Sequence, residues 1–222
     1  MNTYYFYRMT CDTGNAPCVF HQKYTPSDLL TLACCKGGQI RHYKGQVKNI
    51  KTGLRHTVGE DMKNHPKDCF YVIGLLNDRV VYAAKIKDAI PMTDYFSNRE
   101  YRNRMDCIYN VDMKSSDWKL SRRKSFNLNF HGPDYVDQHH HDELGEYVLL
   151  SDEFIYQGKN ADLTIPAELQ ELMPKHQETK KYSDLPAIVH FVASCLRKGK
   201  KGVFEPTERL DEKNCATKGC QK

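Results

Sequence analysis

The sequence predicts a single α+β domain in which helices flank a mixed, mainly antiparallel sheet, with a small, partly open barrel as an alternative form of that sheet. Two apolar runs, 69–76 and 79–86, are separated by a two-residue turn, as in a β-hairpin. Apolar residues between 185 and 196 recur at intervals of three and four, which is typical of an amphipathic helix. With 222 residues, 40% of them hydrophobic, the chain can bury one sizeable core.

The N-terminal third is predicted to contain a strand, a loop and a helix. Tyr4 to Met9 mixes aromatic residues with one arginine and suits a half-buried strand, and a loop follows over 11–17. A helix is expected over 26–36, because Thr25 can act as its N-cap and two glycines follow it. Its segment LLTLACCK is apolar on nearly all sides, so part of it should be buried.

The middle of the chain is predicted to be more irregular. Residues 41–66 are basic, contain glycine and show weak periodicity, which indicates an inserted long loop or an exposed hairpin. Asn77 and Asp78 form the turn of the hairpin over 69–86, and Thr93 can cap a helix that runs to about Arg104.

The C-terminal third is predicted to contain two strands within 147–158, a short helix between Pro166 and Pro174, and a longer helix from Ser183 to near Gly199. The apolar stripe of the longer helix should pack on the sheet. We therefore expect one domain over 1–204 and a polar, frayed tail over 205–222.

The distribution of charge is more informative than the formal net charge of +5. Residues 1–60 contain eight Lys or Arg against three Asp or Glu, whereas residues 134–153 contain seven acids and no Lys or Arg. Such a split is expected of a phosphate-binding surface, and also of an ordinary solvated exterior with charges of both signs. Nucleic acid or a nucleotide is the partner that this pattern favours.

Composition also predicts a compartment. The chain lacks any run of about 18 apolar residues, and its first residues lack the pattern of a signal peptide, so we expect a cytoplasmic protein without a membrane partner. The nine cysteines are odd in number, and adjacent Cys34 and Cys35 are awkward to bridge separately. Reduced thiols are therefore expected.

Two groups of residues suggest metal ligands, but neither has suitable spacing. Cys11, Cys18, His21, Cys34 and Cys35 lack the compact pairs of a zinc site, so buried or loop thiols are favoured, with a reactive thiolate as the alternative. Three consecutive residues, 139–141, cannot all face one metal. A solvated acidic loop is favoured there, with His139 and His141 as the candidate ligands. We predict no metal site.

No standard catalytic motif identifies an enzyme or a cofactor. GxxxxGK[ST], GxSxG and HExxH do not occur, and GxGxxG does not follow a strand. One segment does interleave basic and aromatic residues: Tyr95, Phe96, Arg99, Tyr101, Arg102 and Arg104. Arginine binds phosphate and aromatic faces stack on bases, although an amphipathic helix with solvated arginines explains the same pattern.

Five collinear segments resemble a known family. They are YRMTCDTGNAPC, LLTLACCKGGQIR, FYVIGLLNDRVVYAAKI, TDYFSNREYRNR with CIYN after it, and VLLSDEFIYQGKNA followed by IPAEL. Together they cover about residues 4–175 and resemble the second of the nucleotide modification associated domains, found in phages, prophages and bacterial mobile islands. Residues 41–66 and 134–146 depart from it. The resemblance implies a role beside enzymes that make or handle modified bases, and it implies no catalytic residue.

Three functions are consistent with these observations. The leading one is recognition or processing of a modified nucleobase or nucleotide in a pocket walled by the early turn and the end of the 26–36 helix. Arg8, Lys36, Arg41, Arg99 and Arg102 would contact phosphate, and Asp12, Thr13, Asn15 or Asp152 a base edge. The second is an enzyme with Cys11, Cys18 or Cys34 as nucleophile, or Asp12 and Asp152 as an acid/base pair. The third is a protein-interaction module that uses the acidic loop.

Overall fold

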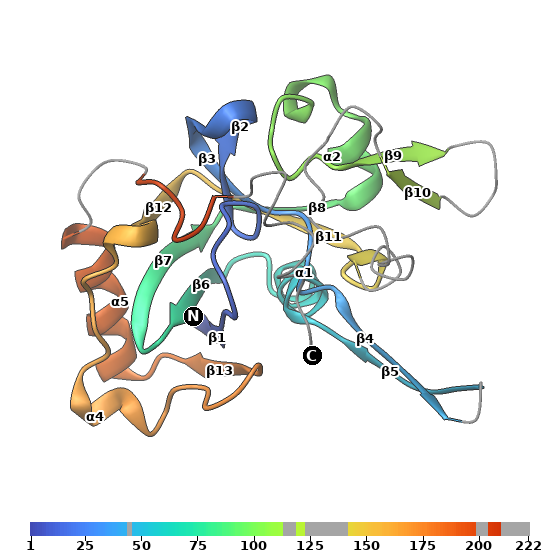
Figure 1. Ribbon diagram of the computed structural model, residues 1–222. Helices are drawn as coiled ribbons and strands as arrows, with labels where there is room; N and C mark the ends of the chain where they lie inside the picture. Colours follow the sequence, from blue (N-terminus) through green and yellow to red (C-terminus); the bar gives the residue numbers. More distant parts are fainter. Residues whose placement is uncertain (44–45, 113–118, 123–141, 199–203, 210–222) are drawn as a thin grey trace.

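A five-stranded sheet forms the centre of the computed structural model, which describes residues 1–43, 46–112, 119–122, 142–198 and 204–209 (Figure 1). The strand order is β12-β7-β6-β1-β13. These strands are β1 (Asn2–Arg8), β6 (Cys69–Leu76), β7 (Arg79–Ile86), β12 (Glu153–Tyr156) and β13 (Thr179–Ser183). β1 runs parallel to β6, and the other pairs are antiparallel. The sheet is therefore mixed and mainly antiparallel, as predicted.

A second sheet of four antiparallel strands has the order β2-β3-β11-β8. It contains β2 (Cys18–His21), β3 (Thr25–Leu32), β8 (Asp88–Pro91) and β11 (Tyr147–Ser151). Two further hairpins pair β4 (Gly38–Tyr43) with β5 (Gln46–Thr52), and β9 (Tyr109–Asp112) with β10 (Lys119–Arg122). Within the described residues no sheet closes on itself, and the α+β class with mixed and antiparallel sheets is confirmed.

Helices lie on both sides of the central sheet. They are α1 (Leu54–Asn64), α2 (Met92–Ser97), α4 (Ala167–Gln170) and α5 (Pro186–Lys198), with 3-10 turns η1 (Gln22–Tyr24), η2 (Arg99–Tyr101) and η3 (Gly158–Asn160). Successive residues of β1 alternate between two cores, as a strand requires. Tyr5 and Tyr7 join the core that includes Leu54 and Val58 of α1, whereas Tyr4 and Phe6 join the core beneath α4 and α5.

Several predicted elements are confirmed. The first strand, the β6–β7 hairpin with its Asn77–Asp78 turn, the two strands within 147–158 and the helix ending near Gly199 all form. Residues 204–209 of the predicted tail lie against the domain, since Lys159 N donates to Glu205 O at 2.9 Å. Residues 41–66 were predicted to form a long loop or an exposed hairpin, and a hairpin is present as β4–β5 over 38–52.

The helix predicted over 26–36 is wrong, because residues 25–32 form strand β3. β3 lies between β2 and β11, and its side chains alternate between two buried clusters: Leu30 and Leu32 belong to one, and Leu29 packs against the other. The first half of β3 is mostly exposed, but its end, from Leu30, is buried on both faces, so the apolar run there has no period that distinguishes it from a buried helix.

Two other helices differ from the prediction. α1 was missed within 41–66, because its buried side includes Arg55 and Gly59 beside Leu54 and Val58 and so lacks an apolar stripe. The helix expected from Thr93 to Arg104 ends at Ser97, where extended Asn98 caps η2 by accepting a hydrogen bond from Glu100 N at 2.9 Å.

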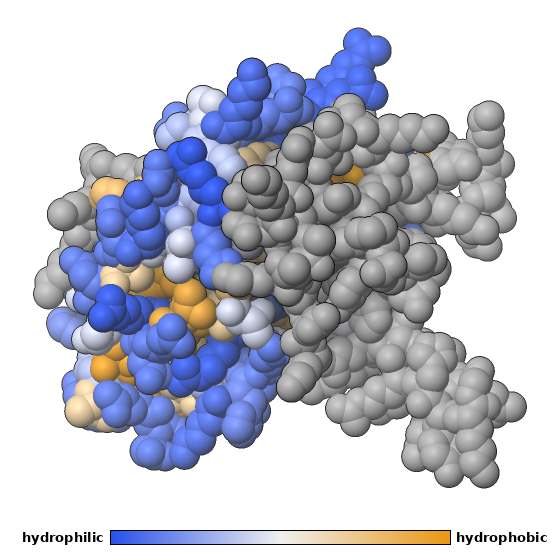
Figure 2. Space-filling view, viewed as in Figure 1, coloured by the Kyte–Doolittle hydropathy of each residue, from blue (hydrophilic) through white to orange (hydrophobic). Residues whose placement is uncertain are grey.

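The described surface is mostly hydrophilic in the view of Figure 2, where apolar residues show through only as a small area between hydrophilic ones. Of the large hydrophobic residues in the described part of the chain, Met1 alone is exposed. No helix in the described ranges is long and apolar enough to cross a bilayer. Recognition at the described surface must therefore depend mainly on polar and charged groups.

Candidate functional site

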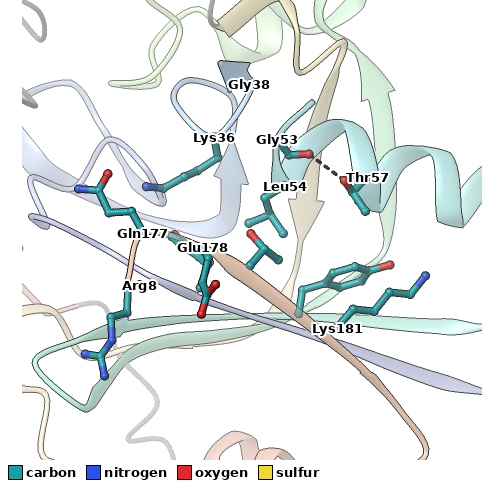
Figure 3. A pocket seen from close by; sticks show the side chains of 12 residues that line it. Arg8, Lys36, Gly38, Gly53, Leu54, Thr57, Gln177, Glu178 and Lys181 are labelled. Carbon is teal, nitrogen blue, oxygen red and sulfur yellow. Dashed lines mark hydrogen bonds between the residues drawn. The ribbon is translucent and has the colours of Figure 1, made fainter. Parts of the chain in front are cut away.

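A cleft of about 430 Å³ opens where β1 and β13 meet the root of the β4–β5 hairpin and the first turn of α1 (Figure 3). Tyr5, Tyr7 and Arg8 of β1 line it, together with Lys36, Gly38, Gly53, Leu54 and Thr57 from the hairpin root and α1, and Gln177 to Thr179 and Lys181 from the segment that enters β13. Pairing of β1 with β13 brings together residues that are about 170 positions apart. The cleft is therefore a product of the tertiary fold rather than of one local motif.

Two tyrosines of β1 form the floor. Tyr5 Oη donates to an Asp61 carboxylate oxygen, and Tyr82 Oη donates to Tyr7 Oη at 3.0 Å. Burial raises the pKa of Tyr7 well above its ordinary value, and burial followed by the hydrogen bond to Asp61 raises the pKa of Tyr5. Both phenols are therefore neutral at physiological pH, and they give the cleft a rigid, uncharged floor.

Three cations line the cleft. Arg8 Nη2 pairs with Asp78 at 2.5 Å, and Lys181 Nζ pairs with Asp61 at 2.7 Å. Lys36 Nζ instead lies 5.1 Å from the centroid of the Tyr7 ring, within the range of a cation–π interaction. None of the carboxylates in the described ranges pairs with Lys36. Lys36 therefore brings a positive charge to the cleft that the described carboxylates leave unneutralised.

The position of Lys36 is set by close backbone contacts with α1. Gly53 N donates to Gly37 O at 2.6 Å, and Arg55 N donates to Lys36 O at 3.2 Å. A Cβ at Gly53 would lie 2.3 Å from Lys36 O, so only glycine permits this approach. The N-terminal end of an 11-residue helix therefore points its partial positive charge at the cleft beside Lys36.

The opposite wall offers hydrogen-bonding groups. Gln177, Glu178 and Thr179 are exposed and precede or begin β13. Figure 3 shows the Lys36 and Gln177 side chains extending toward each other, whereas the Arg8 guanidinium points away from Lys36. The arrangement suits an anion near Lys36 and a polar ring edge near Gln177 and Thr179.

The sequence prediction placed Arg8 and Lys36 at one site, and the structure brings both into this cleft. Arg41 lies in β4 opposite Asn49, and its side chain falls outside the described ones. Arg99 and Arg102 are exposed in and after η2 and do not line the cleft. Of the basic residues predicted to contact phosphate, Arg8 and Lys36 therefore line the cleft, and Arg99 and Arg102 lie elsewhere.

Asp12, Thr13 and Asn15 do not line the cleft. The Asp12 carboxylate is 1% exposed and accepts hydrogen bonds from Tyr156 Oη at 2.8 and 2.9 Å, from Thr207 N at 3.1 Å and from Gly14 N at 3.2 Å. Through these hydrogen bonds Asp12 connects the loop over 11–17 to β12 and to residues 204–209. Asp152 is exposed and pairs with Lys87 at 2.6 Å, so the two aspartates have separate partners.

The seven described cysteines are reduced thiols, and none of them lines the cleft. Burial raises the pKa of Cys18 to about 12, and a hydrogen bond with Cys35 together with burial raises the pKa of Cys34 well above its ordinary value. Both are protonated at neutral pH, unlike an activated thiolate. Cys11 is partly exposed.

The described residues contain no cluster of metal ligands, since no group of three or more His, Cys, Asp or Glu among them could hold a metal ion. His139 and His141 lie outside the described residues. The part of the chain that the structure describes therefore adds no candidate metal centre to those the sequence suggested.

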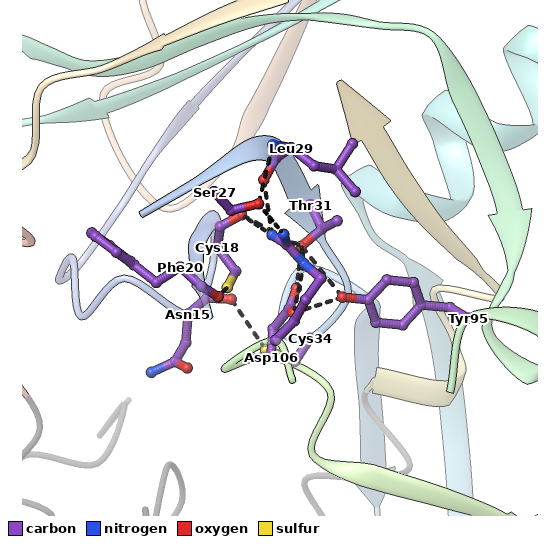
Figure 4. A network of polar contacts seen from close by, with 10 residues as sticks. Asn15, Cys18, Phe20, Ser27, Leu29, Thr31, Cys34, Tyr95 and Asp106 are labelled. Carbon is purple, nitrogen blue, oxygen red and sulfur yellow. Dashed lines mark hydrogen bonds and ion pairs between the residues drawn. The ribbon is translucent and has the colours of Figure 1, made fainter. Parts of the chain in front are cut away.

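Sequence reasoning missed two buried arginine networks. Arg104 was grouped with phosphate-binding or solvated arginines, but it is 1% exposed and lies beside buried Asp106, with 3.7 Å between Nε and Oδ1. Figure 4 shows the surrounding network, in which Thr31 and Tyr95 donate to the Asp106 carboxylate. Arg104 donates to Ser27 Oγ at 2.8 Å, Thr31 Oγ1 at 2.9 Å, Cys18 O at 2.7 Å and Leu29 O at 2.9 Å. Arg104 therefore joins β2 and β3 to the segment after η2.

The second network contains Arg55 and Asp142, both fully buried. Arg55 donates to Cys35 O at 2.7 Å, Tyr147 O at 2.6 Å and Asp142 O at 2.5 Å. The Asp142 carboxylate accepts from Cys35 N at 2.5 Å and Tyr109 Oη at 2.7 Å. Asp142 was predicted to lie in a solvated loop, which is wrong. This network fixes the backbone immediately before Lys36.

Replacing Asp12 by asparagine should change the pH dependence of stability. Burial raises the pKa of Asp12 above its ordinary 3.8, although its hydrogen bonds oppose the shift. Just above that value the folded protein holds a proton that the unfolded chain has lost, so this group makes stability fall as pH rises through the window. In urea unfolding from about pH 4 to about pH 7, the wild-type free energy of unfolding should fall relative to that of Asp12→Asn. A difference that is constant or grows with pH contradicts this assignment.

Comparison with protein families gives a match over nearly the whole chain. A sequence model of the nucleotide modification associated domain 2 family matches residues 1–213 of the 222. No curated protein and no solved structure matches the chain.

Proposed function

Because the chain belongs to the nucleotide modification associated domain 2 family, we propose that its cleft binds a nucleotide and that the protein recognises or processes a modified nucleobase there. Membership of this family suggests a role in nucleotide modification. The cleft between β1, β13 and the hairpin root is the proposed site of that role.

The observation that carries the proposal is the Lys36 ammonium, which faces the cleft without a partner carboxylate among the described residues. A phosphate is the kind of group that such a charge attracts, and the N-terminal end of α1 beside it adds to the attraction. The volume of about 430 Å³ lies within the range of about 300–1,000 Å³ typical of small-molecule sites.

The remaining lining residues divide the cleft into two parts. Lys36 and the first turn of α1 form the part for phosphate, and Gln177 with Thr179 offers both donors and acceptors to a base edge. Tyr5 and Tyr7 are at most 2% exposed, so they support the floor and present little ring face for stacking. Discrimination of a modified base is therefore assigned to hydrogen bonds from the β13 side.

Two of the three cysteines considered as nucleophiles, Cys18 and Cys34, do not support cysteine-based catalysis, and the third, Cys11, lies outside the lining of the cleft. A nucleophilic cysteine needs a lowered pKa and access to its substrate. The pKa values of Cys18 and Cys34 are raised instead, and both side chains are buried. An acid/base pair of Asp12 and Asp152 is not supported either, because each has its own partners.

Replacing Lys36 by glutamine should weaken nucleotide binding by about tenfold or more, since a hydrogen bond to a charged group contributes about 1.5–3 kcal/mol. The probes are deoxynucleoside 5′-monophosphates with unmodified and 5-substituted bases, titrated by calorimetry. Lys36→Arg should restore part of the affinity. Lys87→Gln is the matched control, because Lys87 is exposed, lies outside the cleft and pairs with Asp152. Equal affinities for Lys36→Gln and wild type, or no binding to any probe, would refute the proposal.

A further inference from the structure

The β4–β5 hairpin forms a two-stranded ribbon of its own that extends away from the rest of the described chain (Figure 1). Its strands have six and seven residues, paired from Gly38 opposite Thr52 to Tyr43 opposite Gln46. At about 3.3 Å per residue, such a ribbon is about 20 Å long. It is longer than a simple connection between β3 and α1 requires.

The ribbon is basic along its whole length. Residues 38–52 contain Arg41, Lys44, Lys48 and Lys51 and no Asp or Glu. By register, Lys51 lies near the root opposite Gln39, Arg41 lies opposite Asn49, and Lys48 lies farther out beside that pair. Basic positions thus occur both near the root and farther out along the ribbon, and the segment contains no acid.

The root of the ribbon is fixed to the cleft. Gly53 N donates to Gly37 O at 2.6 Å, and the buried Arg55 guanidinium donates to Cys35 O at 2.7 Å. Gly38 and Gly53 lie side by side at the root, where the chain enters and leaves the ribbon, and both line the cleft. A polymer that lies along the ribbon therefore passes the opening of the proposed nucleotide site.

We propose that the β4–β5 hairpin is a nucleic-acid-binding arm that holds the phosphates of a DNA duplex, so that the cleft receives a nucleotide that is part of a polymer. The inference rests on the proposed function and makes its substrate class specific. The major groove of B-DNA is about 12 Å wide and admits a two-stranded β-ribbon. Lysine and arginine on such a ribbon bind backbone phosphates and displace counterions.

Lysines on free strand edges also prevent edge-to-edge aggregation, and the test separates this role from binding. The variant Arg41→Gln/Lys48→Gln/Lys51→Gln is compared with wild type by fluorescence anisotropy on a labelled 24-base-pair duplex, from 50 to 200 mM salt. The affinity should fall, and the slope of log K against log salt should decrease by about 0.9 for each phosphate that the variant no longer neutralises. Lys51→Gln alone should decrease the slope by about 0.9.

The matched control, Lys23→Gln/Lys67→Gln/Lys87→Gln, removes the same charge from exposed positions outside the hairpin and should keep the wild-type slope. Thermal melts establish that each variant folds. Two further probes are the same DNA strand without its complement and an RNA duplex. The triple substitution should reduce the affinity for these probes less than the affinity for the DNA duplex, because only the DNA duplex has a wide major groove. The inference is overturned if the triple variant binds the duplex with the affinity and salt slope of wild type. It is also overturned if the control variant loses as much duplex affinity as the triple variant does.

Mononucleotide titrations distinguish the two proposals. The triple variant should bind deoxynucleoside monophosphates as wild type does, since the described lining of the cleft contains none of the three substituted residues. If Lys36→Gln has no effect on monophosphate binding while the triple variant loses duplex binding, the nucleotide site is refuted and the arm is supported. If Lys36→Gln weakens monophosphate binding and the triple variant binds the duplex as wild type does, the arm is refuted and the nucleotide site is supported.

Discussion

Arg104→Met is expected to lower the free energy of unfolding by about 3–5 kcal/mol, the range for breaking a buried ion pair by removing one partner. Methionine fills similar space but leaves the Asp106 carboxylate, which is 0% exposed, without its neighbouring cation. The carbonyls of Cys18 and Leu29 also lose a donor while they remain buried in the sheet. Urea unfolding followed by circular dichroism measures the change, and an unchanged m-value shows that the transition remains cooperative.

The matched control for this prediction is Arg102→Met. Arg102 lies two residues away and is exposed, so the same substitution there should change stability by less than about 0.5 kcal/mol. If Arg104→Met costs less than about 1 kcal/mol, the network seen around Arg104 does not contribute to stability as its contacts indicate. A further variant, Arg104→Met/Asp106→Asn, should recover part of the loss, because it also removes the unpaired charge.

Asp142→Asn is expected to cost about 3 kcal/mol, and it should also weaken nucleotide binding. The substitution preserves the shape of the side chain but leaves the guanidinium of Arg55, 3.8 Å away, without an anion in a site with 0% exposure. It also removes an acceptor for Tyr109 Oη. One amide oxygen then replaces the two carboxylate oxygens that accept from Cys35 N and from Tyr109 Oη, so the backbone beside Lys36 should be held less firmly. Urea unfolding measures stability, and calorimetry with deoxynucleoside monophosphates measures affinity at a temperature where the variant is folded.

Glu146→Gln is the control for Asp142→Asn. Glu146 is exposed and pairs with His56 at 3.2 Å, and a surface pair of this kind contributes about 0–1 kcal/mol. Its nucleotide affinity should equal that of wild type. If Asp142→Asn is as stable as Glu146→Gln, the buried pair is not needed for folding. If it is destabilised but binds nucleotide normally, the network does not position Lys36.

Local pattern was sufficient for part of the fold. The β6–β7 hairpin was predictable because its turn residues stand between two apolar runs, and α5 because only one of its sides is buried. β3 was not, since burial on both faces removes the alternation that identifies a strand. Helix α1 was not predictable from the sequence either, because the buried Arg55 stands where an amphipathic helix would have an apolar residue.

The candidate site was predictable only in its basic residues. A positive charge in a segment rich in lysine and arginine indicates phosphate, and this reasoning selected Arg8 and Lys36. Gln177 gives no such signal, and Lys181, although it follows Lys180 in a basic stretch, joins the cleft only through the pairing of β13 with β1. The buried donors around Asp12 could not be predicted, because a polar residue in a turn looks the same in sequence whether it faces a ligand or the protein interior.

The pairing of β1 with β13 also bears on how the protein is made. Thr3 lies opposite Ser183, so one neighbour of β1 is synthesised only after nearly 180 further residues. Until then a growing chain exposes one edge of a tyrosine-rich strand, the kind of edge that recruits strands from other molecules. The wall of the cleft that carries Gln177 and Lys181 also arrives with β13. Completion of the sheet and acquisition of the binding site are therefore the same late event in biosynthesis.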